Sequence, residues 1–329
     1  MHPRAAAKAM SGGQMSGNGQ ERFDKLRLIR SANIGPVTFA HLLARFGSAG
    51  EALRAIPDLA ARGGGRAPRL ADVKDIEAEL AAARKHGARY IFLGEEDYPP
   101  LLGEVDSAPP VVTIRGDATL AARPGIAMVG ARNASAAACR FARGLATDLG
   151  QADFVVTSGL ARGIDAAAHA GSIATGTIAV IAGGIDVTFP PENAALQEEI
   201  AQRGLLIAEQ PPGTRPHARH FPWRNRIIAG LSLGTVVVEA APKSGSLITA
   251  RLAAEAGREV MAVPGSPLDP RAQGCNLLIR EGATLIQSAA DIAEAVGSID
   301  TRMVRQSRAG FEGAPVSAEV EDGDRKSVV

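Results

Sequence analysis

Seven short apolar runs, separated by stretches with helical periodicity, are the feature that most constrains the fold of this chain. The runs are GIAMVGAR, DFVVTSG, TIAVIAGG, GLLIAEQ, GTVVVEA, REVMAVPG and ATLIQS, and they follow one another from Gly125 to Ser288. Consecutive apolar residues indicate strands buried on both faces, and the intervening helices supply the crossovers that parallel strands require. The sequence therefore predicts an α/β fold with a Rossmann-like, doubly wound, mostly parallel sheet.

Composition divides the rest of the chain into further parts. Residues 1–20 are small and Gly/Ser-rich, which predicts disorder. Residues 21–86 carry apolar side chains at helical spacing and predict a small all-helical domain ahead of the α/β domain, which we assign to residues 87–297. Residues 298–329 combine few apolar side chains with clustered charges, which predicts a polar tail or linker.

The helical region is interrupted at Ile34-Gly35-Pro36, between two stretches of helical periodicity. A turn of this kind can present backbone N–H groups to a phosphate, as helix-hairpin-helix modules do. A single turn is weak evidence for such binding, and a structural role is the stronger interpretation.

Several classes of protein are excluded by what the sequence does not contain. No apolar run is long enough to span a membrane, and the first twenty residues lack the apolar centre of a signal peptide. We therefore expect a cytoplasmic protein that does not enter the membrane. Cys139 and Cys275 lie far apart, without neighbouring Cys or His at ligand spacing, so neither a disulfide framework nor a zinc site is indicated.

The first apolar run ends in a modified glycine turn. Gly130-x-Arg132-x-x-Ser135 stands where a dinucleotide-binding fold has Gly-x-Gly-x-x-Gly. Arg132 blocks the close backbone approach that a pyrophosphate needs, but it places a guanidinium where a helix N-terminus already favours anions. The turn predicts phosphate binding without a nucleotide cofactor; the alternative is that Arg132 forms a surface salt bridge.

A basic and aromatic stretch, residues 217–229 (HARHFPWRNRIIA), predicts a nucleic-acid contact just before an amphipathic helix. Bases stack on aromatic faces while arginines follow the phosphate backbone. Phe221 is the better candidate for stacking, because Trp223, the single tryptophan, is equally well interpreted as a core anchor. Residues 210–251 as a whole hold Arg215, Arg219, Arg224, Arg226, Lys243 and Arg251 against Glu239 alone.

A second anion-binding turn is predicted at Lys243-Ser244-Gly245-Ser246, where a further helix begins. N-capping accounts for the serines. It does not account for Lys243, whose charge is unfavourable at the positive end of a helix dipole unless an external anion is present.

Asp165 and His169 stand four residues apart and would share one helix face. Such a pair can act in acid–base chemistry or bind a metal. Without a third ligand nearby, a structural hydrogen bond is the stronger interpretation, and their role stays open.

Taken in order, these blocks resemble the DNA-processing protein A family (DprA, also called Smf). The resemblance rests on VGAR, SGLARGIDAAAH, AGGIDVTFP, HFPWRNRIIAGLS, KSGSLITARLA, REVMAVPG and GCNLLIREGA. The region of residues 21–86 is similar to the family's N-terminal helical domain, often called SAM-like. Many family members end in a winged-helix domain, and the residues after Ser298 are too few and too polar to form one.

The resemblance implies a homodimer that binds single-stranded DNA, protects it and loads the RecA recombinase in natural transformation. It implies no catalytic residue, cofactor or metal. The dimer and RecA interfaces are not predictable from the sequence. The residues predicted to bind DNA are Arg132, Ser135, Arg219, Phe221, Arg224, Asn225, Arg226, Lys243, Ser244, Gly245 and Ser246.

The alternative function is that of a nucleotide-binding hydrolase related to the lysine-decarboxylase-like (LOG) group, which uses a Gly-Gly-x-Gly-Thr-x-x-Glu motif. The nearest match ends at Glu239, lacks the paired glycines and puts the carboxylate on the other face of the strand. A dinucleotide-dependent oxidoreductase and a P-loop NTPase lack their glycine motifs here. A pure protein scaffold would not need the arginine-rich aromatic stretch.

Overall fold

The computed structural model describes residues 17–62 and 68–297. The predictions of a disordered start and a polar tail therefore lie mostly outside the described residues. Residues 17–20 were predicted to be disordered and are helical instead, so the helical region begins at Gly17.

Four helices form the N-terminal domain: α1 (Gly17–Arg30), α2 (Pro36–Phe46), α3 (Ala49–Arg62) and α4 (Val73–Lys85). The predicted interruption at Ile34-Gly35-Pro36 is the turn before α2, and Pro36 fits the first helical position because its missing N–H is not needed there. Gly47 ends α2 in the left-handed conformation (φ 77°), which glycine adopts without strain.

The described residues of the second domain form one nine-stranded sheet in the order β1-β2-β6-β5-β4-β3-β7-β8-β9. All seven predicted strands are present and run parallel to their neighbours among them. They are β3 (Gly125–Gly130), β4 (Val155–Ser158), β5 (Thr177–Gly184), β6 (Leu205–Gln210), β7 (Gly234–Val238), β8 (Glu259–Ala262) and β9 (Thr284–Leu285). The Rossmann-like, mostly parallel fold is thereby confirmed.

Two strands were not predicted. β1 (Arg89–Phe92) pairs with β2 (Val111–Gly116) antiparallel, and β2 pairs antiparallel with β6. Antiparallel neighbours need no helical crossover, so these strands leave no strand–helix–strand pattern in the sequence.

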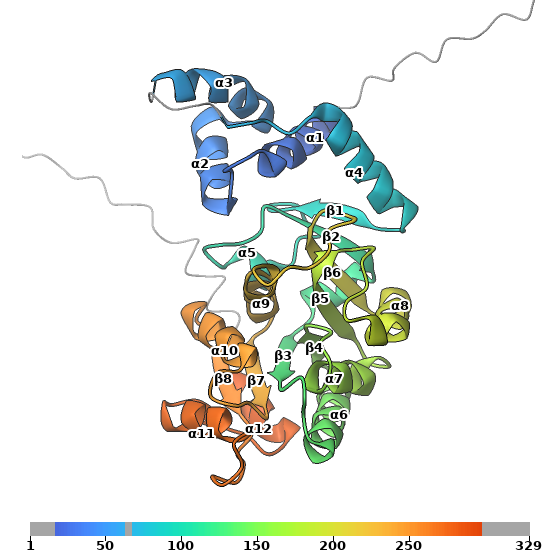
Figure 1. Ribbon diagram of the computed structural model, residues 1–329, viewed down its shortest axis with the longest axis vertical. Coiled ribbons are helices and arrows are strands. Elements are labelled where there is room, and N and C mark those ends of the chain that lie inside the picture. Colours follow the sequence, from blue (N-terminus) through green and yellow to red (C-terminus); the bar gives the residue numbers. More distant parts are fainter. Residues whose placement is uncertain (1–16, 63–67, 298–329) are drawn as a thin grey trace, which may run out of the picture.

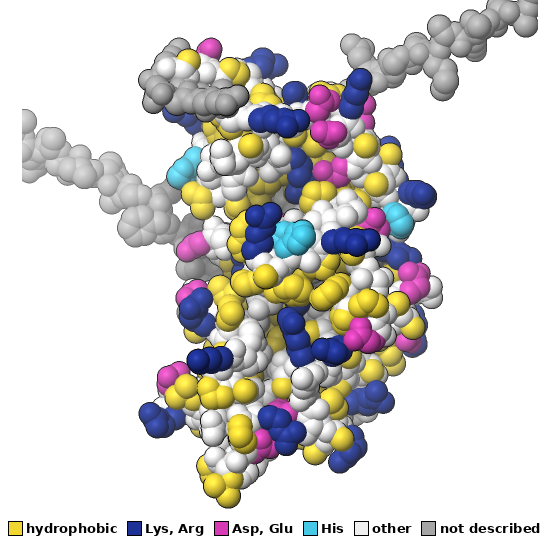
Figure 2. Space-filling view, viewed as in Figure 1, with side chains coloured by type: hydrophobic (Ala, Val, Ile, Leu, Met, Phe, Trp, Pro, Cys, Tyr) yellow, Lys and Arg dark blue, Asp and Glu magenta, His cyan; other side chains and the backbone are white. Residues whose placement is uncertain are grey.

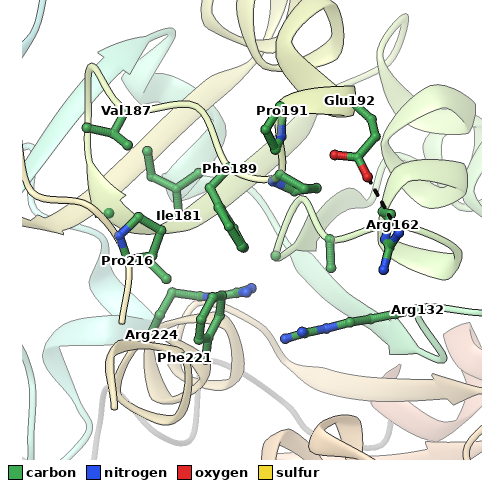
Figure 3. Close-up of a pocket in the computed structure, with 15 residues that line it drawn as sticks. Arg132, Arg162, Ile181, Val187, Phe189, Pro191, Glu192, Pro216, Phe221 and Arg224 are labelled. Carbon is green, nitrogen blue, oxygen red and sulfur yellow. Dashed lines mark hydrogen bonds and ion pairs between the residues drawn. The ribbon is translucent and has the colours of Figure 1, made fainter. Parts of the chain in front are cut away.

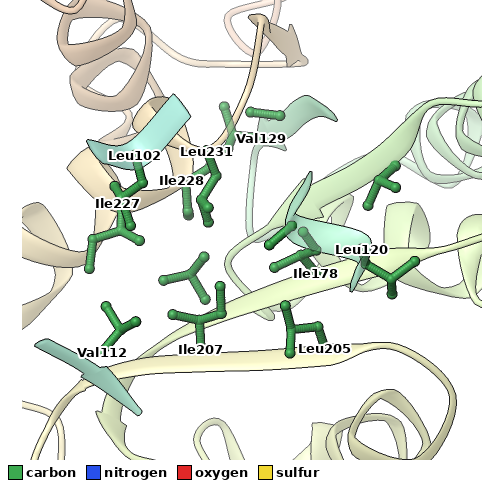
Figure 4. Packing of buried hydrophobic residues seen from close by; sticks show 14 of the residues in the cluster. Leu102, Val112, Leu120, Val129, Ile178, Leu205, Ile207, Ile227, Ile228 and Leu231 are labelled. Carbon is green, nitrogen blue, oxygen red and sulfur yellow. The ribbon is translucent and has the colours of Figure 1, made fainter. Parts of the chain in front are cut away.

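Helices cover both faces of the sheet (Figure 1). They are α5 (Pro100–Gly103), α6 (Ala136–Gln151), α7 (Ile164–Ser172), α8 (Ala194–Arg203), α9 (His220–Gly230), α10 (Gly245–Glu255), α11 (Gln273–Arg280) and α12 (Ala289–Gly297), with 3₁₀ helices η1 (Ala118–Ala122) and η2 (Pro191–Asn193). Helices α5, α9, α10 and α11 share one core cluster, which includes Leu102, Ile227 and Leu231 (Figure 4). Helices α6, α7 and α12 pack into the cluster of the opposite face.

The helical domain is joined to the sheet by a shared core. Leu26 of α1 and Ile76 of α4 are buried in one cluster with Tyr90 and Phe92 of β1. The Tyr90 hydroxyl and the Arg30 guanidinium both donate to the Glu79 carboxylate, at 2.8 and 3.0 Å.

None of the helices among the described residues has the length and apolar character of a membrane-spanning segment.

The order of the parallel strands reverses at β3. The chain passes from β3 through α6 to β4 on one side, and β7 pairs with β3 on the other. In doubly wound folds ligands bind beside the carboxyl ends of the strands at such a reversal.

Candidate functional site

Two adjoining cavities lie at this reversal, beside the carboxyl ends of the parallel strands. One has a volume of about 250 Å³ and the other of about 600 Å³, and both are lined by Arg132, Ala161, Phe221 and Arg224. We call the smaller the apolar cavity, the larger the polar cavity, and the two together the groove. Lys and Arg side chains border hydrophobic surface beside α9 on the face shown in Figure 2.

The apolar cavity is walled by hydrophobic side chains from segments far apart in the sequence (Figure 3). Phe221 of α9 packs against Phe189 with the ring centroids 5.8 Å apart and the planes tilted by 53°. The guanidinium of Arg132 lies 5.2 Å from the centre of the Phe221 ring. At the rim, Arg162 forms an ion pair with Glu192 at 3.5 Å. The further apolar wall residues are Ile181, Ala182, Val187, Pro190, Pro191 and Pro216.

Sequence reasoning did not select Phe189. It lies within the block AGGIDVTFP, shortly after β5. An aromatic residue following the carboxyl end of a buried strand was the available signal, because ligands bind at those ends.

The polar cavity is formed by the start of α10 and the turn after β3. Ser244 caps α10 by accepting a hydrogen bond from the Ser246 backbone N–H, and the two hydroxyl oxygens lie 2.7 Å apart. Asn225 of α9 donates to the carbonyl of Gly245 at 3.5 Å. Lys243 is exposed and lines this cavity with Ser244, Gly245 and Ser246.

Arg132 and Lys243 bring positive charge to the groove without a paired carboxylate. Both side chains line the polar cavity, and among the described residues neither forms an ion pair with an acidic group. The alternative interpretation of Arg132 as a surface salt-bridge partner therefore has no support in the described part of the chain. Two such cations near the α10 N-terminus suit an anionic ligand.

Arg224 is a buried part of the same groove. Its guanidinium lies against Gly159, where a Cβ atom would come within 1.4 Å of Nη1. Burial lowers the pKa of Arg224 to about 10, and the nearby carboxylate of Asp165 opposes that shift. Asp165 is itself buried, which raises its pKa, and it accepts hydrogen bonds from the N–H groups of Gly159 and Ala161 at 3.2 and 3.3 Å. The nearby Asp165 carboxylate therefore partly balances the positive charge of Arg224.

Three predicted site residues line neither cavity. Ser135 caps α6 and hydrogen-bonds to Glu239. Arg226 forms an ion pair with Glu209 at 2.5 Å, which occupies its charge. Arg219 is exposed just before α9.

The sequence predicts that residues 217–229 stand just before a helix, and this prediction was wrong. Residues 220–230 are the helix α9 itself. On this helix Arg224 is buried, whereas Phe221 and Arg226 are half-buried. Trp223 is 56% exposed and is therefore not a core anchor.

Asp165 and His169 belong to separate hydrogen-bond arrangements. His169 Nδ1 lies 2.7 Å from the Thr177 hydroxyl, which donates to the carbonyl of Val156. Since that hydroxyl proton is used, His169 Nδ1–H is the donor to Thr177. Burial lowers the pKa of His169 to about 3. The geometry is that of a structural hydrogen bond rather than of a catalytic pair.

Residues 89–297 match the family model of DNA recombination-mediator protein A, and residues 19–82 match that of the DprA-like N-terminal HHH domain. The chain belongs to the DNA recombination-mediator protein A family. The first match spans the sheet domain, and the second spans most of the domain formed by α1 to α4. The family assignment made from the ordered sequence blocks is thereby confirmed.

Individual DprA proteins are similar over the same region. The DNA processing protein DprA of Bacillus subtilis is 46% identical over 218 residues, which cover 65% of this chain and 73% of the relative. The DprA structure from Streptococcus pneumoniae superimposes with a TM-score of 0.64 at 39% identity, covering 68% of this chain and 78% of that chain. A structure of DprA from Helicobacter pylori, described for its single-stranded DNA binding mode, gives a TM-score of 0.57 at 27% identity, covering 64% of this chain and 95% of that chain.

Proposed function

We propose that this DprA-family protein binds single-stranded DNA in the groove, protects it and passes it to the RecA recombinase. The observation that carries the proposal is the convergence of an aromatic wall at Phe221 with two cations, Arg132 and Lys243, that have no acidic partner among the described residues. Cations that follow phosphates and aromatic rings that stack on bases are what single strands require. DprA from Helicobacter pylori, a relative of this chain, binds single-stranded DNA.

Within the groove, the two cavities suit two parts of one nucleotide. A phosphate fits the polar cavity, where the Lys243 ammonium, the Ser246 side chain and the start of α10 lie together. A base fits the apolar cavity against Phe221 and Phe189. Neither arrangement depends on which base is present, so we expect weak sequence preference.

The proposal is tested by titrating oligo-dT at several salt concentrations. If about four phosphates are neutralised, log affinity falls with log salt at a slope of roughly −3. Phe221→Ala should lower affinity and keep this slope, because stacking releases no counterions. A flat salt dependence in the parent would refute backbone binding.

The homodimer and the RecA partner are further parts of the proposal. Leu277 of α11 and Leu285 of the edge strand β9 are 39% and 46% exposed and provide apolar surface for a second copy.

The family description as a recombination mediator supports RecA as the protein that receives the DNA. We place this activity in the cytoplasm. RecA loading is tested by measuring RecA ATPase on oligo-dT coated with single-strand-binding protein, which the parent should accelerate.

A second candidate function, base release from nucleoside monophosphates, would need a free carboxylate in the groove. The Glu239 carboxylate instead accepts hydrogen bonds from Ser135 and lines neither cavity of the groove. Incubation with nucleoside monophosphates tests the point, and release of free base would overturn our proposal.

A further inference from the structure

Glu239 places a carboxylate at the N-terminus of α6. It follows β7 directly, and its two carboxylate oxygens accept hydrogen bonds from the Ser135 backbone N–H at 2.8 Å and from the Ser135 hydroxyl at 2.6 Å. The Ser135 hydroxyl oxygen in turn accepts from the Ala138 N–H. In a dinucleotide-binding fold the helix after the first strand of the reversal point directs this terminus at a phosphate. Here the position is filled by a side chain of the protein.

The backbone of Glu239 is specialised for this contact. Its φ of 55° lies in the left-handed region, which residues other than Gly, Asn and Asp rarely occupy. In this conformation the Glu239 carbonyl accepts a hydrogen bond from the Ala131 N–H at 2.8 Å. One residue therefore holds both ends of the segment 131–135, its first residue by the main chain and its last by the side chain.

The segment held in this way carries Arg132, whose guanidinium lies in the groove over Phe221. A further hydrogen bond holds the same segment, because the Ile164 N–H donates to the Ala131 carbonyl. Glu239 itself lies outside the groove, in a separate cavity near Asp269. Glu239 therefore lies outside the groove but holds the turn that places Arg132 in it.

We propose that Glu239 is a positioning residue that acts as a built-in anion for α6. Its carboxylate takes the place of a cofactor phosphate, closes the α6 N-terminus to nucleotide phosphates and fixes the turn that presents Arg132. The claim that Glu239 positions Arg132 for DNA binding rests on the proposed function. The claim that its carboxylate serves as the anion of the α6 N-terminus is independent of that function.

Glu239→Gly tests the carboxylate independently of DNA. Glycine retains the left-handed backbone, so the variant removes the anion without introducing strain. We expect its melting temperature to fall by roughly 2 °C or more. Sodium formate should raise that melting temperature more than sodium chloride of equal ionic strength, and the parent should show no such difference.

Asn33→Gly is the matched control, since Asn33 has a similar φ of 61°. Its melting temperature should not fall, and formate should act on it as chloride does. If Glu239→Gly melts with the parent, or if formate has no advantage over chloride, the built-in anion is refuted.

Oligo-dT binding tests the positioning of Arg132. Glu239→Gly should weaken binding roughly fivefold, and Arg132→Ala combined with Glu239→Gly should bind no more weakly than Arg132→Ala alone. Equal losses in both backgrounds would refute positioning through Arg132. If the parent does not bind oligo-dT, the proposed function fails, while the formate experiment still decides the role of the carboxylate.

Discussion

Arg132 and Arg224 line the same cavities and have opposite surroundings. Arg132 is exposed and has no acidic partner among the described residues, so its charge is available to a ligand. Arg224 is buried against Gly159, and the nearby Asp165 carboxylate offsets its charge. We therefore propose that Arg132 binds the ligand and that Arg224 supports the groove.

Arg132→Ala and Lys243→Ala should each weaken oligo-dT binding by about 1–3 kcal/mol, because each removes a charge-assisted contact with phosphate. Each should also reduce the salt slope by about one. Fluorescence anisotropy at several salt concentrations measures both effects. Arg203→Ala is the control, since Arg203 is exposed on α8 and paired with Glu199. A parent-like salt slope in both groove variants would refute the assignment.

His169 should make the protein less stable in acid. Its pKa in the folded chain is lowered to about 3 from 6.5, so between these values the unfolded chain binds a proton that the folded chain does not. Stability from this group is complete above about pH 7 and is lost as pH falls, by about 2 kcal/mol at pH 5.

The measurement is urea unfolding at pH 7 and pH 5 of the parent and of His169→Asn, whose amide can replace the Nδ1–H donor to Thr177. The parent should lose more stability between the two pH values than the variant does. Equal losses would show that the folded protein protonates His169 normally.

At the scale of the elements, α9 packs closely against the turn after β4. Its Arg224 side chain fills the space above Gly159, directly after β4. The helix also contributes Ile227 and Ile228 to the core beneath the groove. The position of α9 is therefore set jointly by apolar burial and by the missing side chain at Gly159.

Gly159→Ala should destabilise the fold by about 1–3 kcal/mol, because the new methyl group would overlap the Arg224 guanidinium. Gly144→Ala is the matched control within α6, where a Cβ has no neighbour within 4 Å, and it should stabilise by about 0.5–1 kcal/mol. Thermal melts compare the two. The explanation fails if both variants shift the melting temperature in the same direction.

At the scale of the whole molecule, the proposed homodimer is tested at the exposed apolar residue Leu277. Leu277→Glu should convert a dimer to a monomer in size-exclusion chromatography with light scattering, because it places a charge in the proposed apolar interface. Leu268→Glu is the control, since Leu268 is 91% exposed on the loop between β8 and α11 and does not belong to the proposed interface at Leu277 and Leu285. A dimer that survives Leu277→Glu would place the interface elsewhere.

The strands β3 to β9 and the interruption before α2 were predictable because their signals are local. A strand buried on both faces must be apolar at consecutive positions, and a helix that starts at Pro36 must do so after a break. The short antiparallel strands β1 and β2 left no such pattern. The helical conformation of residues 220–226 was also not predictable, because the start of α9 carries no one-sided apolar stripe.

The sequence by itself determined the fold class and the chemical character of the groove, since strand burial, glycine turns and basic side chains are properties of consecutive residues. Only the tertiary structure decided which of those side chains are available. It paired Arg226 with Glu209, buried Arg224 near Asp165 and brought Phe189 against Phe221. These contacts join residues from different strands and helices, and the burial or pairing of a charge depends on neighbours that only folding supplies.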